Sequence, residues 1–275
     1  MDMNTQKLMD LALQVAGMET MPNDCDITVA GDDIKKVLMG VDMDTPELLL
    51  AKQLGFDCVV THHPRNTNPD IGDVLNDHIF KLEALGVPRN KAQKVLAKRK
   101  DSLSYRFHVS NSRRSESAAK LLNMPYMSIH TPADLIGEKM VQDFLDEKFV
   151  NKPETTLDHI VNALEELPEY KNSVRKPIIR VGSKDSYAGK IYVLMSGLTG
   201  PGADVLKAYF EAGVGTLVMM HIPEEDVKPI VEQAIGNVII AGHMSSDSLG
   251  MNKIAQKWEE FGVEVTMASG VVTNK

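Results

Sequence analysis

The segment from residue 57 to residue 64 constrains the fold more than any other part of this chain. It reads as a short apolar strand between Gly55 and Pro64, with His62 and His63 at its end. The chain turns at the carboxyl end of a strand, so two successive imidazoles can converge on one point there. Ligands bind at such strand ends in open α/β sheets, and imidazole is the commonest protein metal ligand. The pair therefore predicts a metal site, and two surface histidines in a loop are the alternative.

Composition narrows the class of protein. The chain has 275 residues, of which 43% are hydrophobic and 25% charged, enough for a sizeable core. Its net charge of −8 argues against nucleic acid as the main partner. Cys25 and Cys58 form no paired motif, which favours a reducing cytoplasm. No apolar run is long enough for a transmembrane span, and residues 1–4 lack a basic n-region, so we expect neither a membrane protein nor a signal peptide.

Helix and strand patterns alternate along the chain. Apolar residues at helical spacing predict a helix over 5–16, and a second helix is expected to begin near Thr45, where Pro46 is tolerated in the first turn. This second helix connects a strand at 37–41 to the histidine-bearing strand, which predicts a right-handed crossover between parallel strands. Further strands are expected at 27–29, 104–109, 178–181, 191–195, 216–220, 238–241 and 263–267. The fold class is therefore α/β.

A second histidine site follows the expected strand 238–241. His243 comes directly after Gly242, and Asp247 lies four residues later, in the first turn of a helix. The carboxylate can simply favour the helix dipole, but His and Asp one turn apart also form a compact ligand pair for zinc, iron or manganese. We expect His62, His63, His243 and Asp247 to lie within a few ångströms of one another.

Three more histidines and one turn were considered. His108 ends the expected strand 104–109 and His221 follows the expected strand 216–220, so both are candidates for proton transfer. His130 precedes a helix that begins with Thr131 and Pro132, and it reads as a loop histidine. The glycine-rich stretch 196–202 lacks the Gly-Lys-Ser/Thr of a P-loop and reads as a tight turn, with a nucleotide-binding regulatory module as the weakest alternative.

These motifs together resemble a known family. Thr61-His62-His63-Pro64, His108 and Gly242-His243-Met244-Ser245-Ser246-Asp247, with Gly40-Val41-Asp42 before the first crossover, are similar to the NIF-three-like dinuclear metal centre hexameric proteins, often described as GTP cyclohydrolase I type 2. The resemblance covers most of the chain in order. It implies a two-lobed NIF-three-like fold with sheets flanked by helices and a toroidal homo-hexamer. The lobes would comprise residues 1–130 and 131–275, with 238–275 packing back on the first.

The resemblance also implies the ligands. It identifies His62, His63 and His243 as metal-binding, and Asp247 stands where the family has Glu. The family reads His-Thr-x-Leu-Asp after its strand histidine, and that Asp is a ligand. Aligned from His108, this places Ser112 at the position of the Asp.

A serine at that position predicts one tight metal and a weak second site, because two dications need anionic ligands between them. His108 and Ser112 are then possible ligands or neighbours of ligands. Glu116 or Asp42 could supply the missing charge. The expected cofactor is one or two divalent ions per subunit.

The expected function is a metal-dependent hydrolase that acts on a nucleotide or phosphoester-type substrate through metal-activated water. His108 and His221 would transfer protons. A non-catalytic metal-binding scaffold, or a regulatory or interaction protein on the same fold, is the competing class. Neither the substrate nor the metal follows from the sequence.

Overall fold

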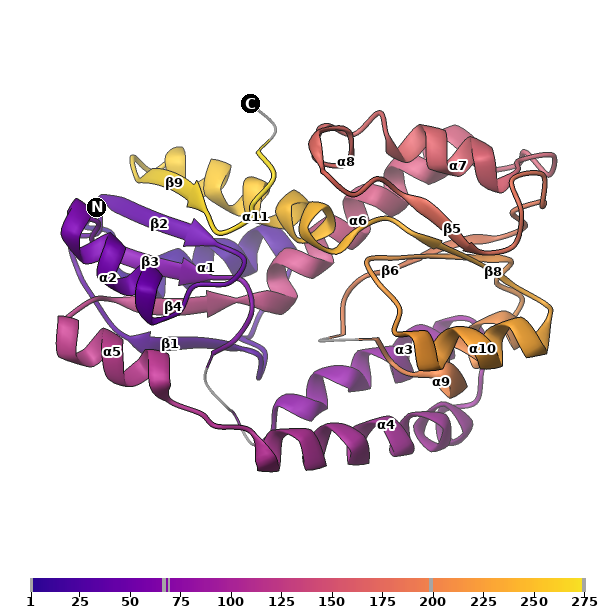
Figure 1. The fold of residues 1–275 in the computed structure, drawn as a ribbon, viewed down its shortest axis with the longest axis horizontal. Helices are drawn as coiled ribbons and strands as arrows, with labels where there is room; N and C mark the ends of the chain where they lie inside the picture. The colour runs from indigo at the N-terminus through magenta and orange to yellow at the C-terminus, as the bar shows by residue number, and fades with distance from the viewer. Residues whose placement is uncertain (1, 66–67, 69, 198–199, 274–275) are drawn as a thin grey trace.

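Two separate sheets with helices around them make up the α/β fold expected from the sequence (Figure 1). The computed structural model describes residues 2–65, 68, 70–197 and 200–273. Within these residues, no helix combines the length and the apolar character that crossing a membrane requires.

The first sheet has the strand order β1-β4-β3-β2-β9. Its strands are β1 (Cys25–Val29), β2 (Lys36–Gly40), β3 (Cys58–Thr61), β4 (Tyr126–Ile129) and β9 (Glu264–Ala268). Strands β4, β3, β2 and β9 run parallel, and β1 pairs antiparallel with β4 at the edge. The expected parallel strand–helix–strand unit is confirmed, because β2 and β3 are parallel neighbours joined by α2 (Thr45–Leu54).

Both faces of the first sheet are covered by helices. Helices α1 (Thr5–Ala16) and α11 (His243–Glu259) pack on one face, and α2 and α5 (Arg114–Leu122) pack on the other. Trp258 of α11 is fully buried and donates its indole N–H to the carbonyl of Leu8 at 3.0 Å, which ties the two ends of the chain together.

The second sheet has the order β5-β8-β7-β6. Its strands are β5 (Ile178–Val181), β6 (Ile191–Leu194), β7 (Thr216–Met219) and β8 (Asn237–Ile240). Strands β6, β7 and β8 are parallel, and β5 is an antiparallel edge strand. The remaining helical elements are η1 (Ile71–Asn76), α3 (Asp77–Ala84), α4 (Arg89–Val109), α6 (His130–Phe149), α7 (Leu157–Leu164), α8 (Pro168–Asn172), α9 (Ala203–Glu211) and α10 (Glu224–Gln233).

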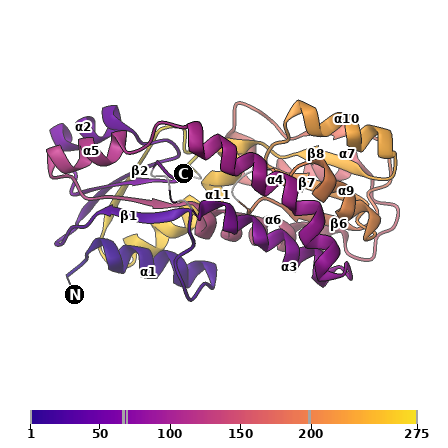
Figure 2. The ribbon, with the colours of Figure 1, turned by 90° about the horizontal axis from the view of Figure 1, so that it is seen from below.

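Three segments of the chain cross between the sheets. Helices α3 and α4 come between β3 and β4 of the first sheet in sequence, yet they pack beside α9 of the second sheet (Figures 1 and 2). Strand β9 belongs to the second half of the sequence but pairs with β2 of the first sheet. Helix α6 follows β4 and continues onto the second sheet, where its outer half packs with α7 and β6.

The strand expected at 104–109 is wrong, because this segment is the last part of α4. Its alternating apolar residues do not mark a buried sheet face: Tyr105 is 77% and Val109 81% exposed. The buried side chains of α4 are those of Ala92, Leu96 and Leu103, which follow one another at intervals of one and two helical turns. Strand β4 is an additional strand that the sequence patterns above do not predict.

Candidate metal centre

The His62–His63 pair is held at the end of β3 by a continuation of the parallel ladder. The backbone N–H of His62 donates to Gly40 O at 2.9 Å and that of His63 to Val41 O at 3.0 Å. The Thr61 hydroxyl adds a hydrogen bond to Val41 O at 3.1 Å. These three hydrogen bonds hold the backbone of the turn against β2 and the residue that follows it. Its two side chains differ in burial: His62 is fully buried, and the His63 side chain is 23% exposed.

A second pair of residues comes from the neighbouring parallel strand. Strand β4 lies beside β3, so their carboxyl ends meet at the same edge, and His130 begins α6 directly after β4. The His130 ring stacks on His62 with a centroid distance of 4.6 Å. Asp134, one helical turn later, brings Oδ1 to 3.2 Å from His62 Nε2. Both His130 and Asp134 are buried.

The third pair comes from the second sheet. His243 and Asp247 occupy the first turn of α11, which follows β8 through Gly242. Gly242 has φ +115°, a conformation that side chains rarely adopt, so the glycine permits this turn. His243 Nε2 lies 3.3 Å from His63 Nε2 across the gap between the sheets, and Asp247 is fully buried.

The second and third pairs belong to an internal repeat. The pattern His-x-x-x-Asp-x-x-Gly begins at His130 and again at His243, in each case where a strand passes into a helix. Helices α6 and α11 cross at the two glycines of the repeat. A Cβ on Gly137 would lie 3.1 Å from a backbone oxygen of α11, and one on Gly250 would lie 1.9 Å from a backbone oxygen of α6. This close crossing brings the two aspartates of the repeat together.

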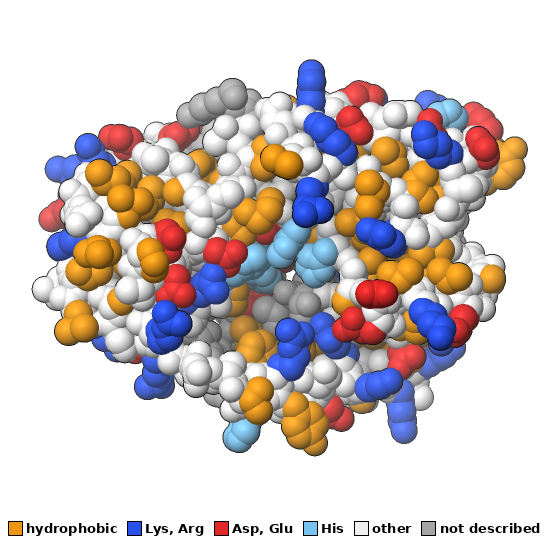
Figure 3. All heavy atoms as spheres, viewed as in Figure 1, with side chains coloured by type: hydrophobic (Ala, Val, Ile, Leu, Met, Phe, Trp, Pro, Cys, Tyr) orange, Lys and Arg blue, Asp and Glu red, His pale blue; other side chains and the backbone are white. Residues whose placement is uncertain are grey.

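Asp247 serves two groups of side chains at once. Its Oδ1 lies 3.6 Å from His62 Nε2, and its Oδ2 lies 3.7 Å from His63 Nε2 and 3.6 Å from His243 Nε2. Together with Asp134 these residues form one buried group, His62, Asp134 and Asp247, and one more open group, His63, His243 and Asp247. In each group the potential ligand atoms lie within 4.8 Å of one another. Histidine side chains gather at a hollow in the middle of the molecular surface (Figure 3).

The buried atoms of this cluster fit a cation. Both ring nitrogens of His62, Oδ1 of Asp134 and both carboxylate oxygens of Asp247 are buried without a hydrogen-bond partner among the described residues. Leaving such groups unpaired in a protein interior is costly, particularly for carboxylates. Imidazole nitrogens together with carboxylate oxygens are the donor set that suits zinc, iron or manganese. The buried His/Asp cluster could therefore hold a metal ion.

The electrostatics of the cluster also favour positive charge. Burial alone lowers the pKa of His62, but Asp247 and Asp134 outweigh it and raise that pKa to about 10. Burial raises the pKa of Asp247, but the adjacent His62 and the other histidines lower it to about 2. Burial, followed by the neighbouring His62, lowers the pKa of His63. The two carboxylates therefore create a site in which a proton or a cation is stabilised.

Two histidines of the cluster have Nδ1 occupied by a carboxylate. His63 Nδ1 lies 2.9 Å from Asp42 Oδ1, and Asp42 also pairs with Arg65. His130 Nδ1 lies 2.7 Å from Oδ2 of Asp24, which is buried. Hydrogen bonds of this kind fix the tautomer of a metal-binding histidine and leave Nε2 for the metal.

Some of the residues predicted from the sequence lie in the cluster, and others do not. The structure brings His62, His63, His243 and Asp247 together, and the His221 ring lies 4.5 Å from that of His243. Burial, followed by the proximity of His243, lowers the pKa of His221 to about 4.

His108 and Ser112 lie elsewhere. Both line a separate surface cavity of about 640 Å³ beside the end of α4, and neither belongs to the His/Asp groups of the described residues. The assignment of Ser112 to the position of a ligand Asp is wrong, because its basis, a strand ending at His108, is a helix. The family pattern His-Thr-x-Leu-Asp is matched instead at His130-Thr131-Pro132-Ala133-Asp134, with Ala in place of Leu. Asp134 brings a second carboxylate to the cluster, with Oδ1 3.2 Å from His62 Nε2.

Sequence reasoning therefore missed three residues of the site: Asp24, His130 and Asp134. The repeated His-x-x-x-Asp-x-x-Gly pattern was the signal that could have revealed His130 and Asp134. Of the two residues considered as substitutes for the carboxylate, Asp42 borders the cluster through His63, whereas Glu116 pairs with Lys120 on α5.

The glycine-rich turn does not present a free helix end. Two of its residues, Leu198 and Thr199, lie outside the described part of the chain. Helix α9 follows the turn, and at its first residue the backbone N–H of Ala203 donates to Asp226 Oδ1 at 2.9 Å. A carboxylate of the chain thus already occupies the position that a phosphate would take.

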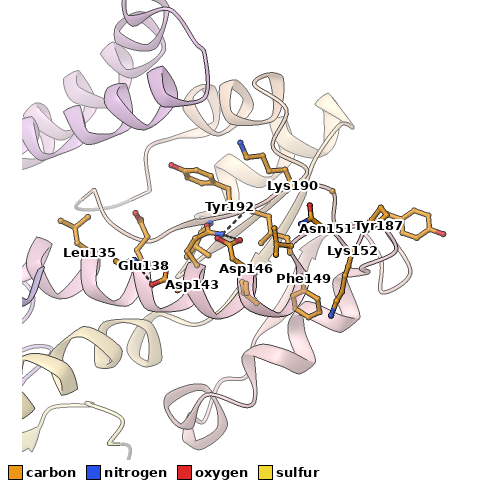
Figure 4. A pocket seen from close by; sticks show the side chains of 18 of the residues that line it. Leu135, Glu138, Asp143, Asp146, Phe149, Asn151, Lys152, Tyr187, Lys190 and Tyr192 are labelled. Carbon is orange, nitrogen blue, oxygen red and sulfur yellow. Dashed lines mark hydrogen bonds and ion pairs between the residues drawn. The ribbon is translucent and has the colours of Figure 1, made fainter. Parts of the chain in front are cut away.

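One cavity among the described residues lies at the cluster, and it is small. The cavity that His221, His130, Asp134, His243 and Asp247 share measures about 20 Å³, room for about one water molecule. A cavity of about 1000 Å³ lies elsewhere, between α6 and the edge strand β6, where Glu138, Phe149 and Tyr192 line it (Figure 4). It contains none of the cluster residues.

A scan against protein-family models and a search of curated proteins gave no match. Among solved structures, the chain is similar to a NIF3 superfamily protein from Sphaerobacter thermophilus, with 34% identity, a TM-score of 0.91, and coverage of 98% of this chain and 99% of that one.

Two more distant structures share the fold. Reduced HcgD from Methanocaldococcus jannaschii has 15% identity and a TM-score of 0.61, with 97% of this chain and 98% of that chain covered. A Bacillus cereus protein related to NIF3 has 12% identity and a TM-score of 0.54, with 97% and 96% covered. Identities this low support a common fold and nothing finer.

Proposed function

The chain belongs to the NIF3 superfamily, and on that premise we propose that its His/Asp cluster holds two divalent cations and serves a metal-dependent hydrolase. The observation that carries the proposal is the position of Asp247. Its two oxygens face separate sets of histidines, at 3.6 Å and at 3.6–3.7 Å, as expected for a carboxylate that bridges two cations. The second carboxylate, Asp134, adds the negative charge that two neighbouring dications require.

Different residues of the cluster would hold the two cations and receive the substrate. His62, Asp134 and Asp247 would hold a buried cation, and His63, His243 and Asp247 would hold a more accessible one. Divalent cations in such a site polarise a phosphoryl or carbonyl oxygen and lower the pKa of water, so that hydrolysis proceeds near neutral pH. His63 and His243 are partly exposed, at 23% and 42% of their side-chain surface, so the substrate would approach from their side. His221 lies against His243 on this side and is placed to transfer a proton.

The proposed substrate class is a nucleotide or another phosphoester. The experiment begins with elemental analysis of protein loaded separately with zinc, iron(II) and manganese. Each form is then screened against phosphate monoesters, phosphodiesters and nucleotides, including GTP for ring opening, beside Asp247→Asn as the control. Two metals per subunit with turnover that Asp247→Asn abolishes would support the proposal. Absence of bound metal would refute it.

A non-catalytic metal-binding scaffold is the second candidate. The observation that favours it is the size of the shared cavity, about 20 Å³, which holds a water molecule and no nucleotide. Two metals per subunit without turnover of any substrate in the screen would favour the scaffold over the hydrolase.

We also propose that the protein assembles into a closed homo-hexamer, as its family resemblance implies. Exposed leucines on the outer helices of the first sheet, Leu50 and Leu54 of α2 and Leu121 of α5, offer an apolar contact surface. Light scattering at micromolar concentration tests this: a hexamer is expected, and a monomer would refute it.

A further inference from the structure

Asp24 directly precedes the edge strand β1 and lies beside His130. Strand β1 pairs antiparallel with β4 in a register that places Cys25 opposite Ile129. The next residue on each strand is therefore Asp24 on one and His130 on the other. This register explains why two residues 106 positions apart in sequence meet at 2.7 Å.

The Asp24 carboxylate accepts hydrogen bonds from the first two residues of α6. Oδ2 of Asp24 accepts hydrogen bonds from His130 Nδ1 at 2.7 Å and from the Thr131 hydroxyl at 2.6 Å. Asp24 is only 1% exposed, and no lysine or arginine of the described residues forms an ion pair with it. A buried carboxylate is costly unless it is hydrogen-bonded, and these two hydrogen bonds, together with the adjacent His130 ring, offset that cost and lower the pKa of Asp24 despite its burial.

We propose that Asp24 is a positioning residue that holds the His130 proton on Nδ1 and thereby directs the Nε2 lone pair of His130 into the metal centre. His130 stacks on His62 and belongs with His62 and His63 to a group whose potential ligand atoms lie within 4.8 Å of one another. A carboxylate behind a metal-binding histidine fixes the ring and increases its basicity. The inference rests on the proposed function for the metal, but the position of the proton can be measured without a metal.

Asp42 forms the corresponding pair with His63. Differences in exposure and in competing partners make the Asp24–His130 hydrogen bond the stronger of the two. Asp42 is 49% exposed at its side chain and shares its carboxylate with Arg65. Solvent and a competing cation weaken its hold on His63. Asp24 has neither competitor, so it determines the state of His130 more completely.

The test compares wild type, Asp24→Asn and Thr131→Val. Nitrogen NMR of histidine-labelled, metal-free protein, above the titration of His130, locates the ring proton, and a His130→Gln sample assigns the signal. Wild type and Thr131→Val should carry the proton on Nδ1, whereas Asp24→Asn should shift the population toward Nε2. Calorimetric titration with zinc should show affinity about 10–100-fold weaker in Asp24→Asn, with Thr131→Val close to wild type.

The outcomes separate the two proposals. Zinc binding to wild type with an unchanged His130 signal and unchanged affinity in Asp24→Asn would overturn the role of Asp24. Equal losses of affinity and thermal stability in Asp24→Asn and Thr131→Val would also overturn it, since they would indicate a purely structural hydrogen bond. Absence of zinc binding to wild type would refute the metal proposal, and the NMR measurement would still decide whether Asp24 sets the His130 proton.

Discussion

Gly250 of α11 lies against Ala133 of α6 so closely that a Cβ on Gly250 would sit 1.9 Å from the Ala133 carbonyl oxygen. No side chain fits at that distance, so the helices can cross here only because position 250 is glycine. Ala133 directly precedes Asp134, and Gly250 lies three residues after Asp247 on α11, so the crossing sets the separation of the two buried carboxylates. The repeat places Gly137 at the equivalent position of α6, where a Cβ would be 3.1 Å from Ser246 O.

Gly250→Ala is expected to force α6 and α11 apart. Overpacking of this kind costs about 1–3 kcal/mol, and it should also reduce bound metal because Asp134 moves away from Asp247. Gly137→Ala, at the matching position of the repeat, needs a shift of only a few tenths of an ångström and should cost less on both counts. Chemical denaturation and elemental analysis of both variants provide the measurement. Equal stability and equal metal content in the two variants would show that the crossing does not position the carboxylates.

The sharing of Asp247 predicts unequal effects of two similar substitutions. Asp247→Asn removes charge from both groups and should leave little bound metal of either kind. Asp134→Asn removes charge from the buried group only, so about one metal per subunit should remain, at the site of His63 and His243. Metal content per subunit, measured by mass spectrometry after dialysis, distinguishes the two variants. Loss of both metals in Asp134→Asn would mean that the two positions are not independent.

Ser112→Asp should change nothing at the metal centre. Ser112 and His108 line a different cavity from the cluster, and Asp134 already supplies the second carboxylate. Metal content of this variant should equal that of wild type. An increase in metal content would restore the assignment of Ser112 that the sequence alignment from His108 suggested.

His78 gives the fold a pH dependence apart from the metal ligands. It is 1% exposed on α3, and burial, followed by the charge of Lys81, lowers its pKa to about 3, although Asp77 acts in the opposite direction. In the unfolded chain histidine titrates near 6.5. Between these values the unfolded chain binds a proton that the native protein does not, so stability falls as pH decreases from about 6.5 toward 3.

Chelator-treated wild type should therefore lose about 2 kcal/mol of unfolding free energy more than His78→Gln between pH 7 and pH 5. Glutamine does not titrate and can still pair with the Tyr209 hydroxyl, which lies 3.2 Å from His78 Nδ1. Urea denaturation of both proteins at the two pH values gives the difference directly. Identical pH dependence in the two proteins would mean that His78 has the same pKa in the native protein as in the unfolded chain.

The local order of the chain was largely readable from its sequence. The helix at Thr5–Ala16, the parallel pair β2 and β3, and the strand that ends in His62 and His63 all follow from short-range periodicity and turn residues. His243 and Asp247 could be paired for the same reason, since four residues on a helix define their own spacing. These features depend on residues that are close together in the sequence, so local sequence patterns are enough to predict them.

The composition of the metal centre was decided only by the tertiary structure. His130 read as a loop histidine until the parallel pairing of β3 and β4 placed it against His62, and Asp134 joined the cluster through the crossing of α6 and α11. His108 was excluded because residues 104–109 form the largely exposed last part of helix α4 and not a strand. Each of these outcomes depends on the packing of segments far apart in the chain, which local periodicity does not encode. The sequence by itself therefore determined which residues at strand ends could act as metal ligands. The packing of segments from the two sheets against one another determined which of these residues lie close enough to share a metal site.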